Sequence, residues 1–154
     1  MLFRSFVKHV KGELARLGTD YAGKSVGIVA ISANDPAVSA DDSPEGLKIM
    51  AAEWGLQYPV CYDESQSVAK AYKAACTPDF FVFDKDRKLA YRGQLDDSRP
   101  SNTVPVTGAD LRGAIDALLT GQQPSSNQKA SIGCNIKWKV GNEPDYYMTP
   151  ATRL

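Results

Sequence analysis

The chain has 154 residues, of which 23% are charged and 43% hydrophobic, and its 18 basic residues balance its 18 acidic ones. This length and composition favour one globular domain with a hydrophobic core and argue against a disordered chain. A neutral chain also lacks the basic surplus that is typical of nucleic-acid-binding proteins, so we expect no nucleic-acid partner.

The beginning of the chain predicts an amphipathic helix over residues 5–21, because apolar and charged residues recur there with helical spacing. The apolar positions are Phe3, Phe6, Val7, Val10, Leu14 and Leu17, and the charged ones between them are Lys8, Lys11, Glu13 and Arg16. His9 lies among the lysines, so we expect its side chain to be solvated rather than to bind a ligand or take part in catalysis. The charges interrupt the segment too often for a secretory signal, and no apolar run approaches the ~18 residues of a membrane helix. We therefore expect a cytoplasmic protein with no membrane partner.

The next segments predict a buried strand and a helix. Residues 25–32 are β-branched and apolar on both faces, which is typical of a strand inside a parallel sheet. After a polar loop, Ser43 and Pro44 have the residue types of a helix N-cap and first helical position. Gly55 ends the helix that they begin.

A second strand and helix follow. Residues 58–62 predict a short strand that contains Cys61, and we expect this thiol to have a structural role within the strand. Asp63 or Ser65 can cap the helix after it.

The stretch "KAACTPDFFVFDKDRKLAYRGQL", residues 73–95, has a cysteine where a helical pattern stops and an apolar strand begins. Pro78 cannot donate a ladder hydrogen bond, and it is either an ordinary strand entry or part of a cis bond at a tight bend. Cys76 is then either a buried packing residue or a thiol presented by that bend. Residues 79–83 and 89–95 predict two strands joined by a charged turn.

The last part of the chain predicts one more helix and an arm. Thr107 is expected to cap a helix that Gly121 ends. The polar linker "QQPSSNQKAS" then leads to Ile136, Trp138 and Val140, which alternate with lysines and indicate a half-buried strand or extended arm.

Together these elements predict an α/β fold with a mixed central β-sheet flanked by helices and an extended C-terminal tail. We expect one domain over residues 1–122, followed by a linker and C-terminal arm over residues 123–154 that packs on the domain.

Three cysteines are too few for a disulfide scaffold, and their odd number leaves at least one free thiol. They lie far apart without a C-x-x-C pair, and the single histidine supports neither a zinc site nor a Ser-His-Asp triad. We therefore expect no metal and no cofactor. The polar cluster at residues 96–99 is interpreted as a local salt-bridged turn.

Three stretches of the sequence, "CTPDFFVFD", "YRGQLDDSRP" and "GCNIKWKVGNEP", resemble one branch of the redoxins. This is the peroxiredoxin-like branch of the thioredoxin superfamily, of the alkyl hydroperoxide reductase/thiol-specific antioxidant type, and the resemblance covers nearly the whole chain. It implies a thioredoxin-like fold in which the bond before Pro78 is cis and its loop faces the N-terminus of the first helix. Redox-active members hold a reactive cysteine there, because helix-terminal N–H groups stabilise a thiolate. Cys76 would then lie beside the redox site.

The sequence departs from this branch at its beginning. The branch has Asn-His-Cys-Pro-Tyr before Val-Lys-His-Val, whereas this chain has Leu-Phe-Arg-Ser-Phe, with Arg4 at the cysteine position. The family's first strand, which is central in its sheet, also belongs before this helix. We therefore expect an N-terminally incomplete domain, or one in which the tail or a partner chain fills the place of that strand.

The resemblance implies a thiol-disulfide oxidoreductase with an antioxidant role, acting on hydroperoxides or protein disulfides. The candidate catalytic residues are Cys76, as the reacting thiol, and Cys134, as the thiol that the tail brings back to resolve it. The candidate substrate-binding residues are Thr77, Pro78 and Arg4. We expect a thiol reductant or a protein disulfide as partner, and a second copy of the chain is a candidate partner in a homodimer. The alternative is a non-catalytic thioredoxin-fold binding module that has lost its redox cysteine.

Overall fold

The computed structural model describes residues 5–148, which cluster into two compact units, each made of two separate stretches of chain. The first unit joins the described residues up to Glu13 to Cys76–Cys134. The second joins Leu14–Ala75 to the tail that starts at Asn135.

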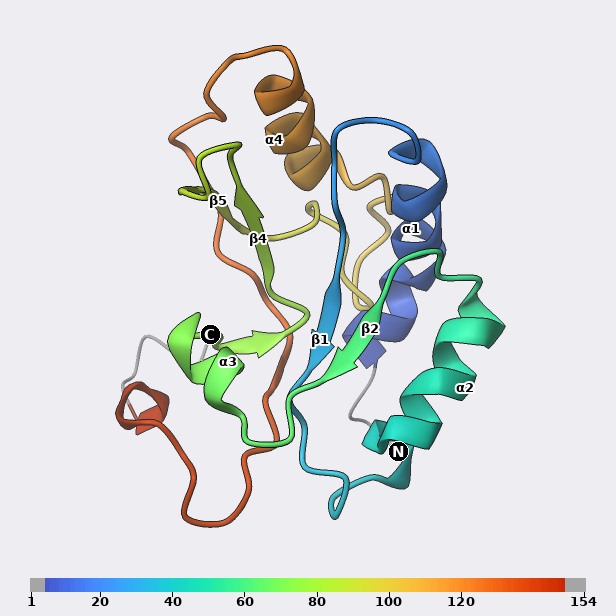
Figure 1. The fold of residues 1–154 in the computed structure, drawn as a ribbon, viewed down its shortest axis with the longest axis vertical. Coiled ribbons are helices and arrows are strands. Elements are labelled where there is room, and N and C mark those ends of the chain that lie inside the picture. Colours follow the sequence, from blue (N-terminus) through green and yellow to red (C-terminus); the bar gives the residue numbers. More distant parts are fainter. Residues whose placement is uncertain (1–4, 149–154) are drawn as a thin grey trace. The chain divides into compact units, whose positions relative to one another are not determined.

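Helix α1 (Ser5–Asp20, Figure 1) confirms the helix predicted at the start of the chain, but one of its charged positions is buried. Glu13 is only 2% exposed, and its carboxylate accepts a hydrogen bond from Nε of Arg112 in an ion pair. Arg112 belongs to helix α4 (Ala109–Leu119) of the same unit. Such a partner is needed, because an unpaired charge away from water costs several kcal/mol.

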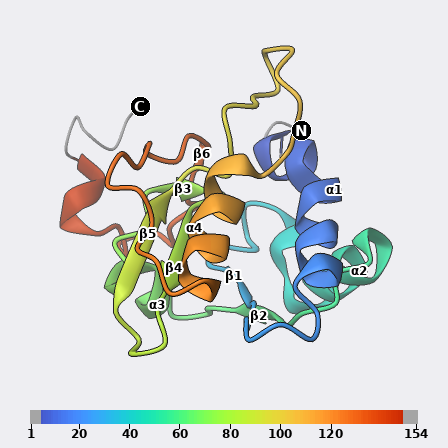
Figure 2. The ribbon, with the colours of Figure 1, turned by 90° about the horizontal axis from the view of Figure 1, so that it is seen from above.

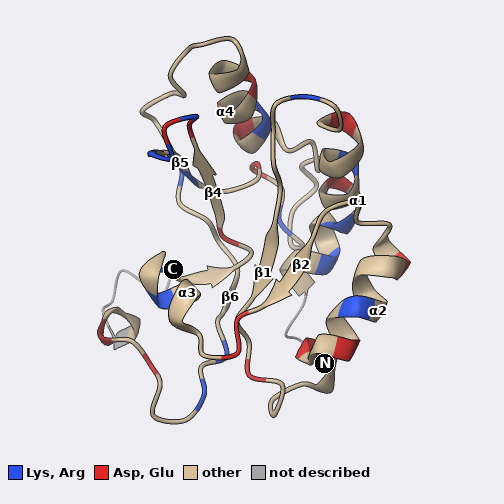
Figure 3. Ribbon diagram, in the orientation of Figure 1, with Lys and Arg blue, Asp and Glu red and all other residues tan. Residues whose placement is uncertain are grey.

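Strands β4 (Phe80–Phe83) and β5 (Leu89–Gly93) form the predicted antiparallel hairpin of the first unit. The turn between them carries charges of both signs (Figure 3). The Asp84 carboxylate stabilises this turn, because it accepts hydrogen bonds from the backbone N–H groups of Asp86 and Lys88 at 2.8 and 2.9 Å.

The core of the first unit includes apolar side chains from β5, from α4 and from the loop between them. Its buried members there are Tyr91, Leu95, Leu111, Ala114 and Ile115. Helix α4 lies beside β4 and β5 in both ribbon views (Figure 2). Burial of a large apolar side chain stabilises a fold by about 1.5–3 kcal/mol before the ordering cost, so this layer holds the hairpin in place.

In the second unit, strands β1 (Ala30–Ser32) and β2 (Val60–Tyr62) pair in parallel. The strand predicted over residues 25–32 is therefore shorter than expected, and the expectation that both of its faces are buried is wrong. Successive side chains of a strand alternate between its faces, and Ile31 and its partner Cys61 share a face on which Ile31 is 45% exposed.

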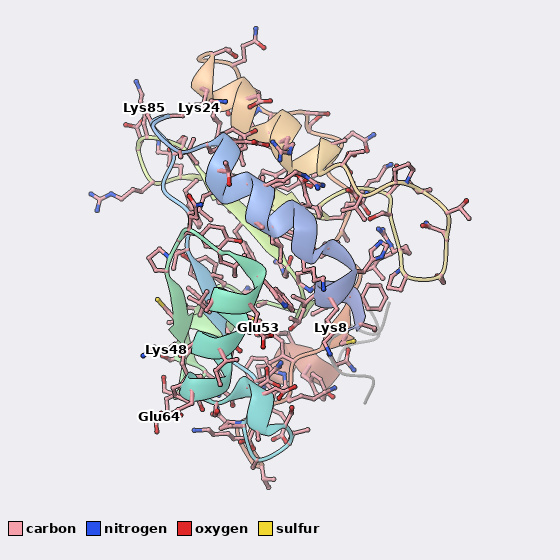
Figure 4. All side chains as sticks on the ribbon, turned by 90° about the vertical axis from the view of Figure 1, so that its right-hand side faces the viewer. Lys8, Lys24, Lys48, Glu53, Glu64 and Lys85 are labelled. Atoms are coloured by element: carbon pink, nitrogen blue, oxygen red, sulfur yellow. The ribbon has the colours of Figure 1, made fainter. Side chains whose placement is uncertain are left out.

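Helix α2 (Pro44–Trp54) begins and ends as predicted. The Ser43 hydroxyl accepts a hydrogen bond from the N–H of Gly46 at 3.1 Å, which is an N-cap. Gly55 follows the helix with a φ of 66°, a left-handed conformation that glycine adopts without strain. Lys48, labelled in Figure 4, lies on the exposed face of this helix.

The described part of the second unit also contains three shorter helices: η1 (Ala40–Asp42), α3 (Ser67–Ala71) and η2 (Asp145–Met148). Gln66, rather than either predicted cap, directly precedes α3. Both predicted residues nevertheless accept hydrogen bonds from its N–H groups: Asp63 from Ala69 at 2.9 Å, and Ser65 from Ser67 at 3.3 Å.

The tail is held in the second unit by one buried amide side chain, that of Gln66, which is 1% exposed. Its Nε2 donates to the carbonyls of Ala33 and Lys137 at 2.7 and 3.0 Å. Its Oε1 accepts from the N–H of Lys139 at 3.0 Å and from the amide of Asn142 at 2.7 Å. Two donated and two accepted hydrogen bonds use the full capacity of an amide side chain, so the burial of Gln66 leaves no polar group unsatisfied.

Apolar side chains of the tail pack on α3. Ile136 and Trp138 are 6% and 8% exposed and cluster with Ala69, as their alternation predicts. Val140, the third apolar residue of the alternation, is 99% exposed, so the expectation that it is buried with the other two is wrong. The chain turns at Gly141, whose φ is 77°, and this turn ends the alternation one residue after Val140.

Hydrogen-bonded strands occur in three pairs within residues 5–148: β1 with β2, β4 with β5, and β3 (Cys76–Thr77) with β6 (Cys134–Asn135). The β1–β2 pair is parallel and the β4–β5 pair antiparallel. A single mixed central sheet stays a prediction. None of the described helices is both long enough and apolar enough to cross a membrane.

We predict that Gln66→Glu lowers the free energy of unfolding by about 2–4 kcal/mol, because a carboxylate cannot donate to the carbonyls of Ala33 and Lys137 and places a charge beside them. Urea denaturation monitored by tryptophan fluorescence measures this change. Gln57→Glu is the matched control at an exposed position of the same unit and should alter stability by less than about 0.5 kcal/mol. Equal unfolding free energies for the two variants would contradict the role given to the buried amide.

Candidate functional site

A buried thiol lies directly before a bend in the first unit. Cys76 and Thr77 form β3, and the peptide bond between Thr77 and Pro78 is cis. Cys76 is 7% exposed, and its S–H donates to the carbonyl of Pro78 at 3.6 Å. The predicted substrate-binding residues Thr77 and Pro78 thus make the bend that follows the thiol, while Arg4 lies outside the described residues.

The second predicted thiol, Cys134, lies in the strand hydrogen-bonded to β3 and is half-buried. The preceding residue, Gly133, packs so closely that a Cβ there would clash with the carbonyl of Thr77. Glycine is therefore required for this close approach. Cys134 is also near enough to Cys76 to affect the pKa of its thiol. The structure thus brings together two cysteines that are far apart in the sequence.

The surroundings of Cys76 disfavour its thiolate. Burial raises the pKa of the Cys76 thiol to about 12, with a further increase from the Asp79 carboxylate, a decrease from the Arg92 guanidinium and an increase from Cys134. Arg92 is paired with Asp79 at 3.4 Å, so much of its positive charge is already compensated. Cys76 is therefore a neutral thiol near pH 7.

Cys61 differs from the other two cysteines. It lies in β2 of the second unit, as predicted, but it is exposed rather than packed. None of the three cysteines forms a disulfide within the described residues. Within the part of the chain that the structure describes, no group of three or more histidine, cysteine, aspartate or glutamate side chains could hold a metal ion.

Asp96 organises the loop that follows β5. It is 4% exposed, and its carboxylate accepts backbone hydrogen bonds from Ser98, Thr107 and Gly108 at 2.9, 2.8 and 2.7 Å. Burial acts to raise the pKa of Asp96, but hydrogen bonding from the Ser98 side chain and from these backbone N–H groups outweighs it, so the pKa is lowered. Thr107 was expected to cap α4. The residue before the helix is instead Gly108, and the capping oxygen comes from Asp96.

Gln94, which is 3% exposed, connects the same loop to α4. Its Nε2 donates to Asp97 and to Asp110 at 2.7 Å each, and its Oε1 accepts from Nη2 of Arg99. The Arg99 guanidinium therefore donates a hydrogen bond to the neutral amide oxygen of Gln94.

The remaining hydrogen bonds of Arg99 go to backbone carbonyls of the same loop. Its Nη1 donates to the carbonyls of Asp96 and Ser98 at 2.8 and 2.6 Å. The ion pair of this loop is formed instead by Asp97 with Lys129, at 2.8 Å. The predicted local salt-bridged turn is therefore a network in which the arginine binds carbonyl and amide oxygens.

A small cavity of about 20 Å³ lies between the cis-proline bend, this loop and the first turns of α1. His9 and Ser98 line it, and Nε2 of His9 is buried. His9 is therefore half-buried rather than fully solvated as expected, whereas Lys8 beside it is exposed (Figure 4). The sequence held a signal for this: His9 lies at helical spacing from Phe6 and Glu13, on one side of α1.

The strand pairs, the helices and two thiols beside a cis-proline are compatible with a thioredoxin-like α/β protein. The match to the Redoxin family extends over residues 7–111, more than half of the chain. The chain belongs to the Redoxin family.

Two solved structures are similar to this chain. An uncharacterized conserved protein from Geobacillus kaustophilus is 58% identical, with a TM-score of 0.86 over 88% of this chain and 71% of that chain. A hypothetical protein from Sinorhizobium meliloti 1021 is 46% identical, with a TM-score of 0.88 over 91% of this chain and 78% of that chain. No curated protein matches the chain.

We predict that Asp96→Asn lowers the free energy of unfolding at pH 7 by about 1–3 kcal/mol, because the charged acceptor of three N–H groups becomes a neutral one. The pKa of Asp96 is lowered in the folded chain, so its contribution is present above the unfolded-state pKa of about 3.9 and is lost as the pH falls through the folded-state pKa. The stability difference between parent and variant should therefore shrink below about pH 4.

Thermal or urea unfolding at a series of pH values measures this difference. Asp86→Asn, at an exposed position, is the control and should change stability by less than about 0.5 kcal/mol throughout. A difference between parent and Asp96→Asn that does not depend on pH would contradict the role of the charge.

Proposed function

We propose that the protein is a thiol-dependent oxidoreductase whose reactive pair is Cys76 and Cys134, and that it reduces hydroperoxides or protein disulfides. The observation that supports this most is the position of the two cysteines on hydrogen-bonded strands beside the Thr77–Pro78 bend. Membership of the Redoxin family supports thiol-redox chemistry.

We assign the first attack to Cys134 and the resolving step to Cys76, the reverse of the order expected from the sequence. A pKa of about 12 leaves Cys76 almost wholly protonated near pH 7, and the thiolate is the nucleophile. Cys134 is only half-buried, so an oxidant reaches it more readily. Thr77 and Pro78 would contact the substrate from the bend, and Arg4 stays a candidate for the same role.

The proposed cycle consumes one hydroperoxide as the oxidant and one dithiol as the reductant. The Cys134 thiolate attacks the terminal oxygen of the hydroperoxide, the O–O bond breaks, and an alkoxide leaves that takes up a proton to become an alcohol. Cys76 then attacks the resulting sulfenic acid, which forms the disulfide and releases water. A dithiol reductant restores both thiols and is itself oxidised to a disulfide. With a protein disulfide as substrate, Cys134 forms a mixed disulfide that Cys76 resolves.

We also propose that the protein has an antioxidant role in the cytoplasm. Cysteines that form no disulfide among the described residues are compatible with a reducing compartment. We further propose that residues 1–122 form the redoxin domain and that residues 123–154 form an arm packing on it. The family match over residues 7–111 and the burial of Ile136 and Trp138 support this division.

The raised pKa of Cys76 favours a second candidate function, a thioredoxin-fold module that binds a partner without turnover. Peroxide turnover in the presence of dithiothreitol separates the two. We predict that Cys134→Ser and Cys76→Ser each reduce turnover at least tenfold, while Cys61→Ser, in the other unit, leaves it unchanged. Equal background rates for all four proteins would favour the binding module.

We also predict that Gly133→Ala slows formation of the Cys76–Cys134 disulfide at least tenfold, because the added methyl group clashes with the carbonyl of Thr77 and pushes β6 from β3. Mass spectrometry of alkylated peptides, taken at intervals after addition of one equivalent of oxidant, measures the rate. Gly113→Ala is the control, since a Cβ there has no neighbour within 4 Å among the described residues. An unchanged rate in Gly133→Ala would argue against this pair as the reactive one.

A further inference from the structure

After α4 the chain of the first unit runs back along β5. Gln128 makes two hydrogen bonds there: its Nε2 donates to the carbonyl of Ala90 at 2.9 Å, and its Oε1 accepts from the N–H of Arg92 at 3.0 Å. The Lys129 carbonyl accepts from the N–H of Gln94 at 2.9 Å. Because β5 pairs with β4 on its other side, this stretch covers the backbone edge of β5 that the hairpin leaves open.

The stretch that covers this edge, residues 128–134, fits closely against its neighbours at two places. A Cβ at Gly93 would clash with the carbonyl of Lys129, and a Cβ at Gly133 would clash with the carbonyl of Thr77. Glycine allows the backbones to approach this closely because it has no Cβ. At its end the stretch enters β6, which is hydrogen-bonded to β3. We call residues 128–134 the strap.

The strap is held by hydrogen bonds rather than by buried side chains. Each of its residues is half-buried or exposed. A further hydrogen bond joins Oγ of Ser131 to the carbonyl of Gly93 at 2.6 Å. Segments with few buried apolar contacts open locally at a small fraction of the free energy of global unfolding. We therefore expect the strap to open and close while the rest of the unit stays folded.

Two thiols lie at the ends of the segment that the strap closes. Cys76 is the first and Cys134 the last residue of the longer of the two chain stretches in the first unit. The two residues belong to the hydrogen-bonded strands β3 and β6, and Cys134 is near enough to raise the pKa of the Cys76 thiol. A disulfide across about 60 residues removes many open conformations of a chain, more than one across a short loop. A bond between these cysteines would therefore act directly on the opening of the strap.

We propose that residues 128–134 are a redox-controlled strap, which opens from β5 while Cys76 and Cys134 are thiols and is fastened when they form a disulfide. This inference rests on the proposed function, which supplies the oxidant: a hydroperoxide takes two electrons from the two thiols, and its O–O bond is cleaved to give an alcohol and water. An open strap leaves N–H and C=O groups of β5 unpaired, and such an edge can pair with an extended segment of another chain. Oxidation therefore closes this edge to strand pairing.

Amide hydrogen exchange measured by NMR tests the strap. In a Cys61→Ser background, diamide oxidises the other two thiols to a disulfide and is itself reduced to a hydrazine, and mass spectrometry verifies the bond. We expect the N–H groups of Arg92 and Gln94 to exchange at least tenfold more slowly after oxidation, because both donate to the strap. The N–H of Asp84, which donates to the Lys88 carbonyl in the hairpin turn, is the internal control and should exchange at the same rate in both states.

Two variants of the Cys61→Ser protein test the parts of the mechanism separately. Cys134→Ser cannot form the bond, so diamide should leave its exchange rates unchanged. In the reduced state, Ser131→Ala removes one hydrogen bond of the strap and should speed the exchange of the Gln94 N–H roughly 2- to 10-fold, the range for one hydrogen bond. Ser126→Ala, at an exposed position before the strap, is the matched control and should not alter this rate.

Three results would overturn the proposal: no Cys76–Cys134 disulfide after treatment with diamide; unchanged exchange at Arg92 and Gln94 in the oxidised protein; or equal slowing at Asp84, which would mean that the bond stabilises the whole unit rather than the strap. None of these measurements uses a peroxide. Failure of the proposed function is seen separately, as peroxide turnover that does not respond to Cys76→Ser or Cys134→Ser.

Discussion

The candidate site depends on the hydrogen bonds that the carboxylate of Asp96 accepts. One buried charge accepts the N–H groups of Ser98, Thr107 and Gly108, so the loop after β5 and the start of α4 share one acceptor. This arrangement turns the carbonyls of the loop toward Arg99 and leaves the Ser98 hydroxyl at the cavity wall. A charged acceptor suits this role because hydrogen bonds to an ionised group are stronger than those between neutral groups.

Packing brings the two thiols of the first unit close together, but their surroundings do not stabilise the thiolate of Cys76. Gly133 allows β6 to approach Thr77, and the same enclosure that gives this proximity removes water from Cys76. Asp79 lies near enough to disfavour the Cys76 thiolate further, and its ion pair with Arg92 weakens the stabilising effect of that guanidinium on the thiolate. The geometry suits disulfide formation, while the electrostatics disfavour the thiolate of Cys76.

The sequence predicted well those features that depend on neighbouring residues. The helix begun at Ser43 and ended at Gly55 follows from cap chemistry within one turn. Residue type alone does not predict the burial of Glu13 and of Nε2 of His9, although helical spacing aligns both residues with apolar neighbours. The role of Gln66 could not be read from local patterns, since three of its four partners lie more than 70 residues away.

Those distant partners set the order in which the second unit can fold. The hydrogen bonds that join the tail to Gln66 and Asn34 span 71 to 103 residues. A chain emerging from the ribosome makes local helices and hairpins early, whereas contacts of this sequence separation close late and slowly. Until residues 137–142 have been made, the Gln66 amide has only the Ala33 carbonyl among these partners. The second unit therefore completes its interior only after residues 137–142 have been made, and before that point the Gln66 amide lacks three of its four hydrogen-bond partners.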